Sequence, residues 1–303
     1  MAYTEDYRRQ VALLIRILPY VGEEECFALK GGTAINLFIR DLPRLSVDID
    51  LTYLPVKSRA ASLAEIDAAM KRIEARIAQN FPAATITQSL TESTITKLLV
   101  RENAVQIKVE VTPVLRGCVF EPETRNISST VEEGFGFASI KLVSFCDLYA
   151  GKLVAALDRQ HPRDLFDVRD LLSNEGIGDD LRDTFIVYLI SHGRPMNETL
   201  TARRKDISLE FERNFAGMTD EPVSLDELLQ ARESLVDVLI GGMPNRHKEF
   251  LIGFEKGPPD WSLLGLENVD KLPAVLWRQK NLDSLSSDRR AGLVSDLEKV
   301  LNK

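Results

Sequence analysis

The chain has 303 residues, 44% of them hydrophobic and 28% charged, with a formal net charge of −8 and an isoelectric point near 5.2. This composition is typical of a globular protein with a sizeable core. The chain has no overall excess of positive charge that would indicate binding to nucleic acid, but a negative net charge is compatible with a local basic path. The three cysteines are far apart and fit no zinc-binding spacing. With no signal-peptide pattern and no apolar run of membrane-spanning length, we expect a cytoplasmic protein without a membrane partner.

The first part of the chain alternates helical and extended patterns. Apolar residues recur at helical spacing over residues 5–21 and again in the segment before Pro82, so each segment is predicted to be a helix. Between them, Gly31-Gly32 is expected to turn the chain into a helix that runs through Ile39. Short apolar or alternating runs predict five strands, at residues 27–29, 47–54, 84–88, 94–100 and 104–111.

The second part is expected to be helical. The apolar stripe from Ser139 to Leu157 predicts one helix, which His161-Pro162 ends, and residues 163–172 form the next. A glycine-containing link over residues 174–178 is the expected boundary between a core domain, residues 1–175, and a helical C-terminal domain, residues 176–303. The pattern as a whole predicts an α/β fold.

An Asp-x-Asp sequence on the second predicted strand is the most informative feature. Alternation places Asp48 and Asp50 on one face of that strand and the apolar residues around them on the other. Two adjacent carboxylates repel each other, and a hard divalent cation that also holds phosphate oxygens would neutralise them. Glu110, on the polar face of a later strand, is a possible third carboxylate. Separately, such patterns are common by chance, but their combination with a glycine turn favours metal-dependent nucleotidyl transfer.

Other features have an ordinary structural interpretation beside a functional one. Lys152 is either a lysine that reaches solvent along an apolar helix or a cation that holds triphosphate oxygens. The charged residues between Asp158 and Asp170 would ordinarily form a solvated ion-pair network. The basic clusters at residues 203–205 and 246–248 are candidate phosphate contacts only if RNA binds. Trp261 and Trp277 are expected to be core anchors.

At this point the sequence resembles the AbiEii/AbiGii-type nucleotidyltransferase toxins of bacterial type IV toxin–antitoxin systems, with the related MenT enzymes. The resemblance rests on LKGGTA at residues 29–34, LSVDIDL at 45–51, IKVEV at 107–111 and, most specifically, DLYAGKLVAALDR at 147–159 with PRDLFDV at 162–168. It continues at residues 191–198, 259–261 and 272–275, and so covers most of the chain.

The resemblance implies a polymerase beta-like mixed-sheet core and roles that spacing does not show. Asp48 and Asp50 would be catalytic and would hold Mg²⁺ or Mn²⁺, with Glu110 as a less certain third ligand. Lys152 and Asp167 would also be catalytic, the lysine by binding nucleotide phosphates, and Asp164 would support them. The NTP would be bound by Lys30, Gly31, Gly32, Thr33 and Ser46. Ser46 also stands where some MenT-like toxins are phosphorylated as a form of neutralisation.

The resemblance further implies the reaction. The enzyme would transfer a nucleoside monophosphate from an NTP to an RNA hydroxyl, with the 3′ end of tRNA as the expected acceptor, and so block translation in phage defence. A cognate antitoxin would be its partner. Two alternatives stay open: a small-molecule nucleotidyltransferase similar to antibiotic-modifying enzymes, and a non-catalytic protein that binds nucleotide or a partner. The intact Asp48, Asp50 and Lys152 argue against the second alternative.

Overall fold

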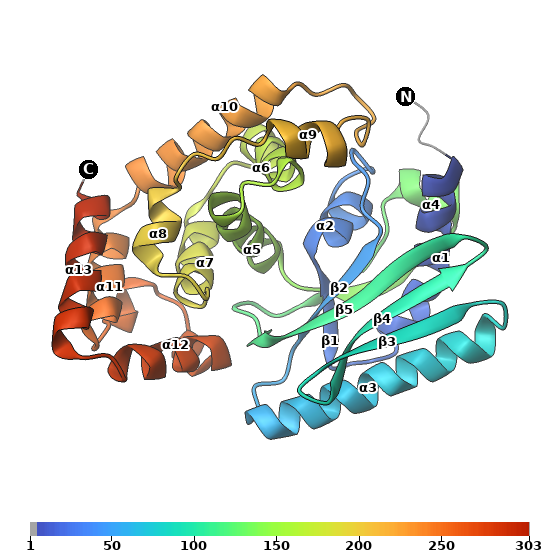
Figure 1. Cartoon of the computed structure of the whole chain (residues 1–303), viewed down its shortest axis with the longest axis horizontal. Helices are drawn as coiled ribbons and strands as arrows, with labels where there is room; N and C mark the ends of the chain where they lie inside the picture. Colours follow the sequence, from blue (N-terminus) through green and yellow to red (C-terminus); the bar gives the residue numbers. More distant parts are fainter. Residues whose placement is uncertain (1–4, 303) are drawn as a thin grey trace. The chain divides into compact units, whose positions relative to one another are not determined.

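A seven-stranded mixed sheet organises the first part of the chain (Figure 1). The computed structural model describes residues 5–302 and groups them into two units, one that ends at Ser144 but also includes Gly217–Pro222, and one formed by Phe145–Ala216 and Val223–Lys303. The elements of the first unit are α1 (Glu5–Gly22), β1 (Phe27–Lys30), α2 (Gly31–Ala34), a π-helical turn η1 (Ile35–Ile39), β2 (Asp48–Tyr53), α3 (Arg59–Asn80), β3 (Thr85–Thr91), β4 (Thr94–Glu102), β5 (Val105–Arg116), β6 (Glu123–Asn126), α4 (Ser129–Phe135) and β7 (Ser139–Leu142).

The strands follow the order β3-β4-β5-β2-β1-β7-β6, in which β2 pairs with β5 and β1 with β7 in parallel and the other neighbours are antiparallel. Helix α1 packs along β5 and β7, and α3 packs along β3, β4 and β5. Along β2 and β5, the apolar residues Ile49, Leu51, Val109 and Val111 are buried. Because successive strand residues point to opposite faces, the charged residues between them lie together on the other face.

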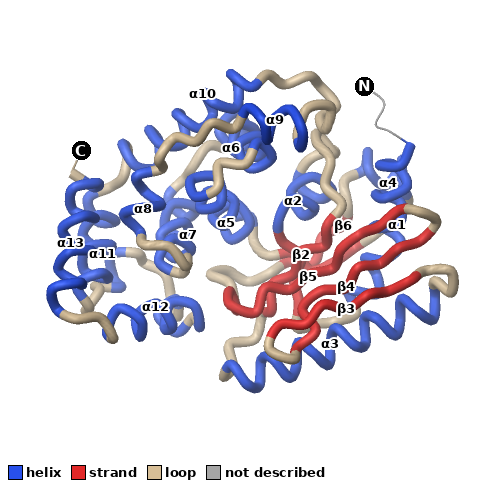
Figure 2. Tube along the Cα trace, in the orientation of Figure 1, coloured by secondary structure: helices blue, strands red, loops and turns tan. Residues whose placement is uncertain are grey.

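The second unit consists of helices and loops, whereas the strands are gathered in the first unit (Figure 2). Its elements are α5 (Phe145–Asp158), α6 (Pro162–Asn174), α7 (Asp179–Ile190), α8 (Met196–Thr201), α9 (Ser208–Asn214), α10 (Leu225–Val236), η2 (Asp237–Gly241), α11 (Asn245–Lys256), η3 (Trp261–Leu263), η4 (Val269–Lys271), α12 (Pro273–Asp283) and α13 (Ser287–Leu301). None of the helices within residues 5–302 has the length and apolar character needed to span a membrane.

The α/β fold predicted from the sequence is confirmed, and each of the five predicted strands is present with its ends shifted by a few residues. The predicted helix from Ser139 to Leu157 is wrong at its start, because residues 139–142 form strand β7 and α5 begins at Phe145. In β7, Ile140 and Leu142 are buried, and the strand pairs with β1 and β6. The pairing of β7 with its neighbours therefore determines the structure of residues 139–142. Leu142 has the spacing of the apolar stripe of α5 only by coincidence.

The division into units differs from the boundary expected near residue 175. Helices α5 and α6 pack against each other, α5 also packs against α7, and α6 against α10, all in the second unit. The units therefore divide between Ser144 and Phe145 rather than at the glycine-containing link.

Candidate active site

Four neighbouring strands of the first unit align two carboxylates with a lysine on either side of them. In the register of the sheet, Lys30 on β1 lies opposite Asp50 on β2, and Asp50 lies opposite Glu110 on β5. Glu110 in turn lies opposite Lys97 on β4. Because residues in register across a sheet share a face, the four side chains form one row on the face opposite the apolar residues of β2 and β5.

Lys108 lies at the centre of the carboxylates on this face. Its Nζ is 2.7 Å from Glu110 Oε2 and 3.4 Å from Asp48 Oδ2, and its distance to Asp50 Oδ1 is 3.9 Å. Lys97 Nζ approaches the other oxygen of Glu110, at 3.2 Å. The two aspartates predicted to share a face thus meet the third carboxylate around one ammonium group.

The pKa values on this face follow from burial and from these contacts. Burial raises the pKa of Asp50, and the neighbouring Asp48 raises it further against the opposing effect of Lys108. Burial acts against the charged form of Lys108, yet its hydrogen bond to Glu110 and the nearby aspartates raise its pKa. Burial likewise favours neutral Glu110, but Lys108 and Lys97 outweigh it and lower the pKa. The two lysines therefore favour the ionised form of Glu110, whereas the pKa of Asp50 stays raised.

The three carboxylates are a donor set that suits a hard divalent cation. Carboxylate oxygens are preferred ligands of Mg²⁺, and the side chains of Asp48, Asp50 and Glu110 are 43%, 35% and 32% exposed, so that solvent and ions reach them. Within residues 5–302, no three carboxylate, histidine or cysteine side chains are already gathered as metal ligands. On this face the ammonium of Lys108 lies among the three carboxylates.

The glycine turn lies directly against these residues. Gly31 has a φ of +78°, and a Cβ atom there would come within 2.8 Å of Asp50 Oδ2. A Cβ atom on Gly32 would come within 2.8 Å of Ser46 Oγ and 2.7 Å of Arg44 Nη2. Gly31 thus has a backbone conformation that favours glycine, and a side chain at either position would displace a neighbouring side chain.

Thr33 and Ser46 hold the start of β2 in place. The buried Thr33 hydroxyl donates a hydrogen bond to the backbone carbonyl of Asp48 and lies 3.1 Å from Ser46 Oγ. The Ser46 amide donates to the Tyr7 hydroxyl at 2.6 Å. Beside them, burial lowers the pKa of Lys30, against the attraction of nearby carboxylates. In this arrangement Thr33 positions the backbone of Asp48.

The second unit holds a separate cluster, built by α5 and α6. Lys152 Nζ lies 2.9 Å from Asp164 Oδ1 and 2.9 Å from Asp167 Oδ2, and Arg159 makes a two-pronged ion pair with Asp164. The Lys152 side chain is 8% exposed and each aspartate 1%. Burial would raise the pKa of Asp164, but Lys152 and Arg159 hold it well below its usual range. The solvated network expected here is thus a buried one, because α5 packs its lysine onto α6.

Comparison with known proteins decides the family. A family model described as the nucleotidyl transferase AbiEii toxin of type IV toxin–antitoxin systems matches residues 12–275, most of the chain. The chain belongs to the AbiEii family. The resemblance and the enzyme class inferred from it are therefore confirmed: the protein is a nucleotidyltransferase of a toxin family.

A solved structure with the same fold is MenT4, a nucleotidyltransferase toxin from Mycobacterium tuberculosis H37Rv. The two chains share 14% sequence identity with a TM-score of 0.55, over 100% of this chain and 94% of that one. At this identity the likeness shows a common fold. A comparison with curated protein sequences gave no match.

The structure thus brings some of the predicted site residues of this AbiEii-family chain together. Asp48, Asp50 and Glu110 lie on one face, Lys30 is in register with Asp50, and Gly31 touches Asp50. A second set, Gly32, Thr33 and Ser46, lies at the start of β2. The third set, Lys152, Asp164 and Asp167, forms its own cluster in the second unit. The catalytic and binding roles of these residues stay predictions.

Sequence reasoning missed two cations of the first unit. Lys108 stands two residues before Glu110 on an alternating strand, a spacing that places both on one face and could have identified it. Arg44, 2% exposed, lies against Gly32 and donates to the carbonyl of Leu45. No motif marks Arg44, because only the folded chain brings it to the glycine turn.

The basic clusters of the C-terminal half are largely engaged within the protein. Arg246 Nη2 lies 2.7 Å from Asp183 Oδ1, and the buried His247 ring hydrogen-bonds to the same carboxylate. Arg204 makes a two-pronged ion pair with Glu233. These contacts lie within the second unit and leave fewer basic groups for phosphate than the sequence suggested.

The two tryptophans have different environments. Trp261 packs edge-on against the buried Phe250, with ring centroids 5.2 Å apart, although Trp261 itself is only partly buried. Trp277 is 58% exposed, so its expected core role is wrong. Its helix α12 buries Ala274 and Val275 instead, and adjacent helix positions cannot all face the core.

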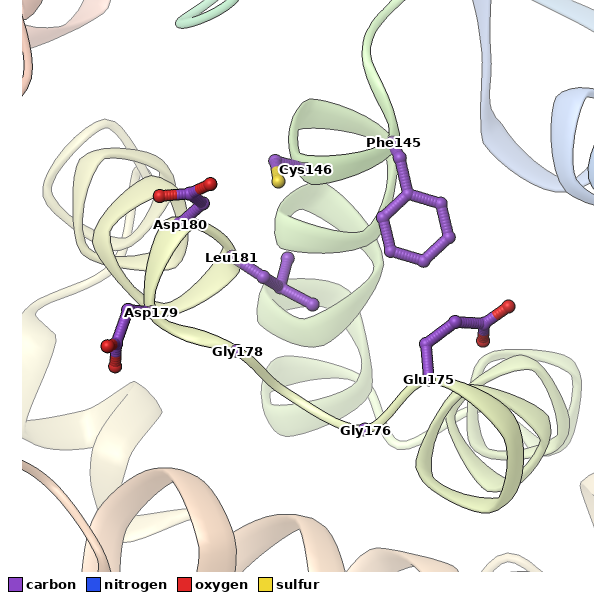
Figure 3. Close-up of a pocket in the computed structure, with 8 residues that line it drawn as sticks. All are labelled: Phe145, Cys146, Glu175, Gly176, Gly178, Asp179, Asp180 and Leu181. Atoms are coloured by element: carbon purple, nitrogen blue, oxygen red, sulfur yellow. The ribbon is translucent and has the colours of Figure 1, made fainter.

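A hollow of about 290 Å³ in the second unit contains none of the predicted site residues (Figure 3). It lies between the start of α5 and the link from α6 to α7, with Glu175 on one side and Asp179 and Asp180 on the other. Burial and nearby carboxylates raise the pKa of Cys146 in its wall to about 11. A raised pKa keeps the thiol protonated at neutral pH, which disfavours it as a nucleophile.

Replacing Gly31 with alanine is expected to lower nucleotidyl transfer by about 10²-fold, because the new Cβ would displace the Asp50 carboxylate that it meets at 2.8 Å. The matched control is Gly217→Ala: Gly217 has a φ of +79° but no atom within 4 Å of its Cβ position. Both changes carry the same backbone strain, so thermal unfolding should show similar losses of stability. Equal activity of the two variants would disprove the contact with Asp50 as the cause.

Proposed function

We propose that this protein transfers a nucleoside monophosphate from an NTP to an RNA hydroxyl, with the 3′ end of tRNA as acceptor, in a reaction that depends on Mg²⁺ or Mn²⁺. The observation that carries the proposal is the carboxylate face of the first unit, where Asp48, Asp50 and Glu110 surround one cationic group beside a glycine turn. Divalent metal ions held by these carboxylates would concentrate positive charge next to the triphosphate. The glycine turn would let the backbone approach the same phosphates.

Asp48 and Asp50 would hold the metal ion, with Glu110 as a further ligand. When bound, the ion would neutralise charge on the triphosphate and orient the attacking hydroxyl. Other residues of the chain would position the carboxylates and the triphosphate. Gly31 and Gly32 let the backbone approach the phosphates, Thr33 fixes the backbone of Asp48, and Lys30 adds positive charge beside Asp50.

The family resemblance implies that Lys152 and Asp167 take part in the same reaction. Lys152 would bind the phosphates of the nucleotide. The ion pairs of Lys152 with Asp164 and Asp167 hold its side chain in one orientation in a largely buried environment, which suits a residue that must present a charge to phosphate. Lys152 must then exchange part of its interaction with the aspartates for one with the nucleotide.

RNA as acceptor is consistent with the charge of the chain. The net charge of −8 weakens any general affinity for nucleic acid, but the end of an RNA chain needs only a local basic path to the reacting atoms. Lys97 and Lys108 supply positive charge next to the carboxylates. Modification of the tRNA 3′ end would prevent aminoacylation and stop translation, which fits a toxin in the cytoplasm with a cognate antitoxin as partner.

The acceptor is tested by incubating the protein with Mg²⁺, each labelled NTP in turn, and total bacterial RNA. We expect label on tRNA-sized RNA for a preferred NTP, and none when the RNA is first oxidised with periodate, which destroys the 3′-terminal diol. Asp48→Ala is the negative control. Label on oxidised RNA would contradict the 3′ end as acceptor, and label on an added aminoglycoside but not on RNA would select the small-molecule alternative.

A further inference from the structure

Lys108 is placed as a counter-ion for all three carboxylates of the candidate metal site. Its Nζ lies within 4 Å of an oxygen of Asp48, of Asp50 and of Glu110, at 3.4, 3.9 and 2.7 Å. Lys97, another lysine on this face, forms an ion pair with Glu110. The position of Lys108 follows from the sheet, since it lies in register with Asp48 and shares its strand face with Glu110.

We propose that Lys108 is a tethered counter-ion that competes with the divalent metal for Asp48, Asp50 and Glu110, and that the metal binds by displacing its ammonium group. This inference rests on the proposed function, because it takes the three carboxylates as metal ligands. Lys108 is a positioning residue: its charge offsets the repulsion among the three carboxylates and holds them close together until the metal replaces it.

Geometry makes the competition direct. Mg²⁺ binds carboxylate oxygens at roughly 2.0–2.1 Å and requires near-octahedral space around it. A metal ion on the same oxygens that face Lys108 would therefore stand next to the ammonium, at a separation where two cations repel each other strongly. The ammonium and the metal ion therefore cannot both occupy this place. The metal ion carries the higher charge, so the ammonium is the one that leaves.

The side chain of Lys108 has the freedom to move. It is 27% exposed, and a lysine carries its charge at the end of a flexible four-carbon chain. Its backbone is fixed in β5, between β2 and β4, so that the ammonium would move away while the strand stays in place. The released charge would then be free to meet the negative phosphates of a metal-bound nucleotide.

The first test measures Mn²⁺ binding without nucleotide, by calorimetry or by the loss of the free-ion electron paramagnetic resonance signal. Lys108→Met should bind Mn²⁺ at least roughly tenfold more tightly than the native protein, since the competing charge is gone. It should also unfold at lower temperature in EDTA and recover with Mn²⁺. The control is Lys71→Met, which removes an i,i+4 pair with Asp67 on α3 and should leave Mn²⁺ affinity unchanged.

The second test uses the native chain and so does not depend on the variant folding. An amine-reactive acetylating reagent is applied with and without Mn²⁺, and modification of each lysine is measured by mass spectrometry. Modification of Lys108 should rise when Mn²⁺ is present, while that of the exposed Lys71 stays constant. Lower or unchanged modification of Lys108 would overturn the proposal.

The outcomes separate this inference from the proposed function. If the native protein binds Mn²⁺, Asp48→Asn abolishes that binding, and Lys108→Met binds no more tightly than native, the competition is disproved while the metal site stands. If the native protein binds no Mn²⁺ that depends on Asp48, both the metal dependence and the competition are disproved.

Discussion

Replacing Asp50 with asparagine is expected to reduce nucleotidyl transfer by on the order of 10³-fold or more, because an amide cannot supply the negative charge that holds a metal ion. The fold should survive the change. Asp50 is partly buried among like charges, and burial raises its pKa, so its ionised form is costly in the metal-free protein. Removing the charge relieves repulsion with Asp48 and Glu110, and the thermal midpoint in EDTA should stay constant or rise.

The control for this change is Asp296→Asn, an exposed aspartate of α13 that pairs with Lys299. It removes the same charge from the chain and should keep native activity, since exposed pairs contribute little. Initial rates with saturating NTP and RNA compare the variants. An Asp50→Asn protein that retains more than about a tenth of native activity would refute the assignment of Asp50 to the metal site.

Replacing Lys152 with methionine is expected to lower the free energy of unfolding by about 3–5 kcal/mol, because it removes a cation that two buried carboxylates share. Asp164 and Asp167 are each 1% exposed, and both lie 2.9 Å from Lys152 Nζ. Arg159 remains paired with Asp164 in this variant. Urea-induced unfolding measures the change.

The matched control is Lys256→Met, which makes the same substitution at an exposed ion pair with Glu298 in the same unit. Exposed pairs contribute about 0–1 kcal/mol, so the control should unfold close to the native midpoint. Similar stabilities of the two variants would show that the Lys152 cluster is not a buried network. Activity assayed well below the unfolding transition then separates a catalytic contribution of Lys152 from its structural one.

The sequence alone was sufficient for the face that Asp48 and Asp50 share, because strand alternation is a local rule. It could not supply the register between strands, which places Lys30, Asp50 and Glu110 side by side. Register depends on how distant segments pack, and single-strand patterns do not contain it. Alternation along β5 shows that Lys108 and Glu110 share a face, but the nearness of Lys108 to Asp48 and Asp50 is visible only once β5 lies beside β2.

Helix predictions failed where tertiary contacts outweigh local pattern. The four residues of β7 fit the stripe of the following helix, yet they pair with β1 and β6. Charge density around Asp164 suggested a solvated surface, whereas Lys152 from another helix allows the aspartates to be buried. Trp277 is exposed because its helix has only one buried face, and that face is made by smaller residues.

The most direct test of the account follows the two ends of the triphosphate, using the preferred NTP labelled at either the α- or the γ-phosphate, with the native protein and with Asp48→Ala. The account predicts that α-label enters RNA and γ-label leaves as pyrophosphate, and that Asp48→Ala does neither. Transfer of γ-label to RNA would mean phosphoryl rather than nucleotidyl transfer. Native-level α-label transfer by Asp48→Ala would show that the carboxylate face of the first unit is not the active site.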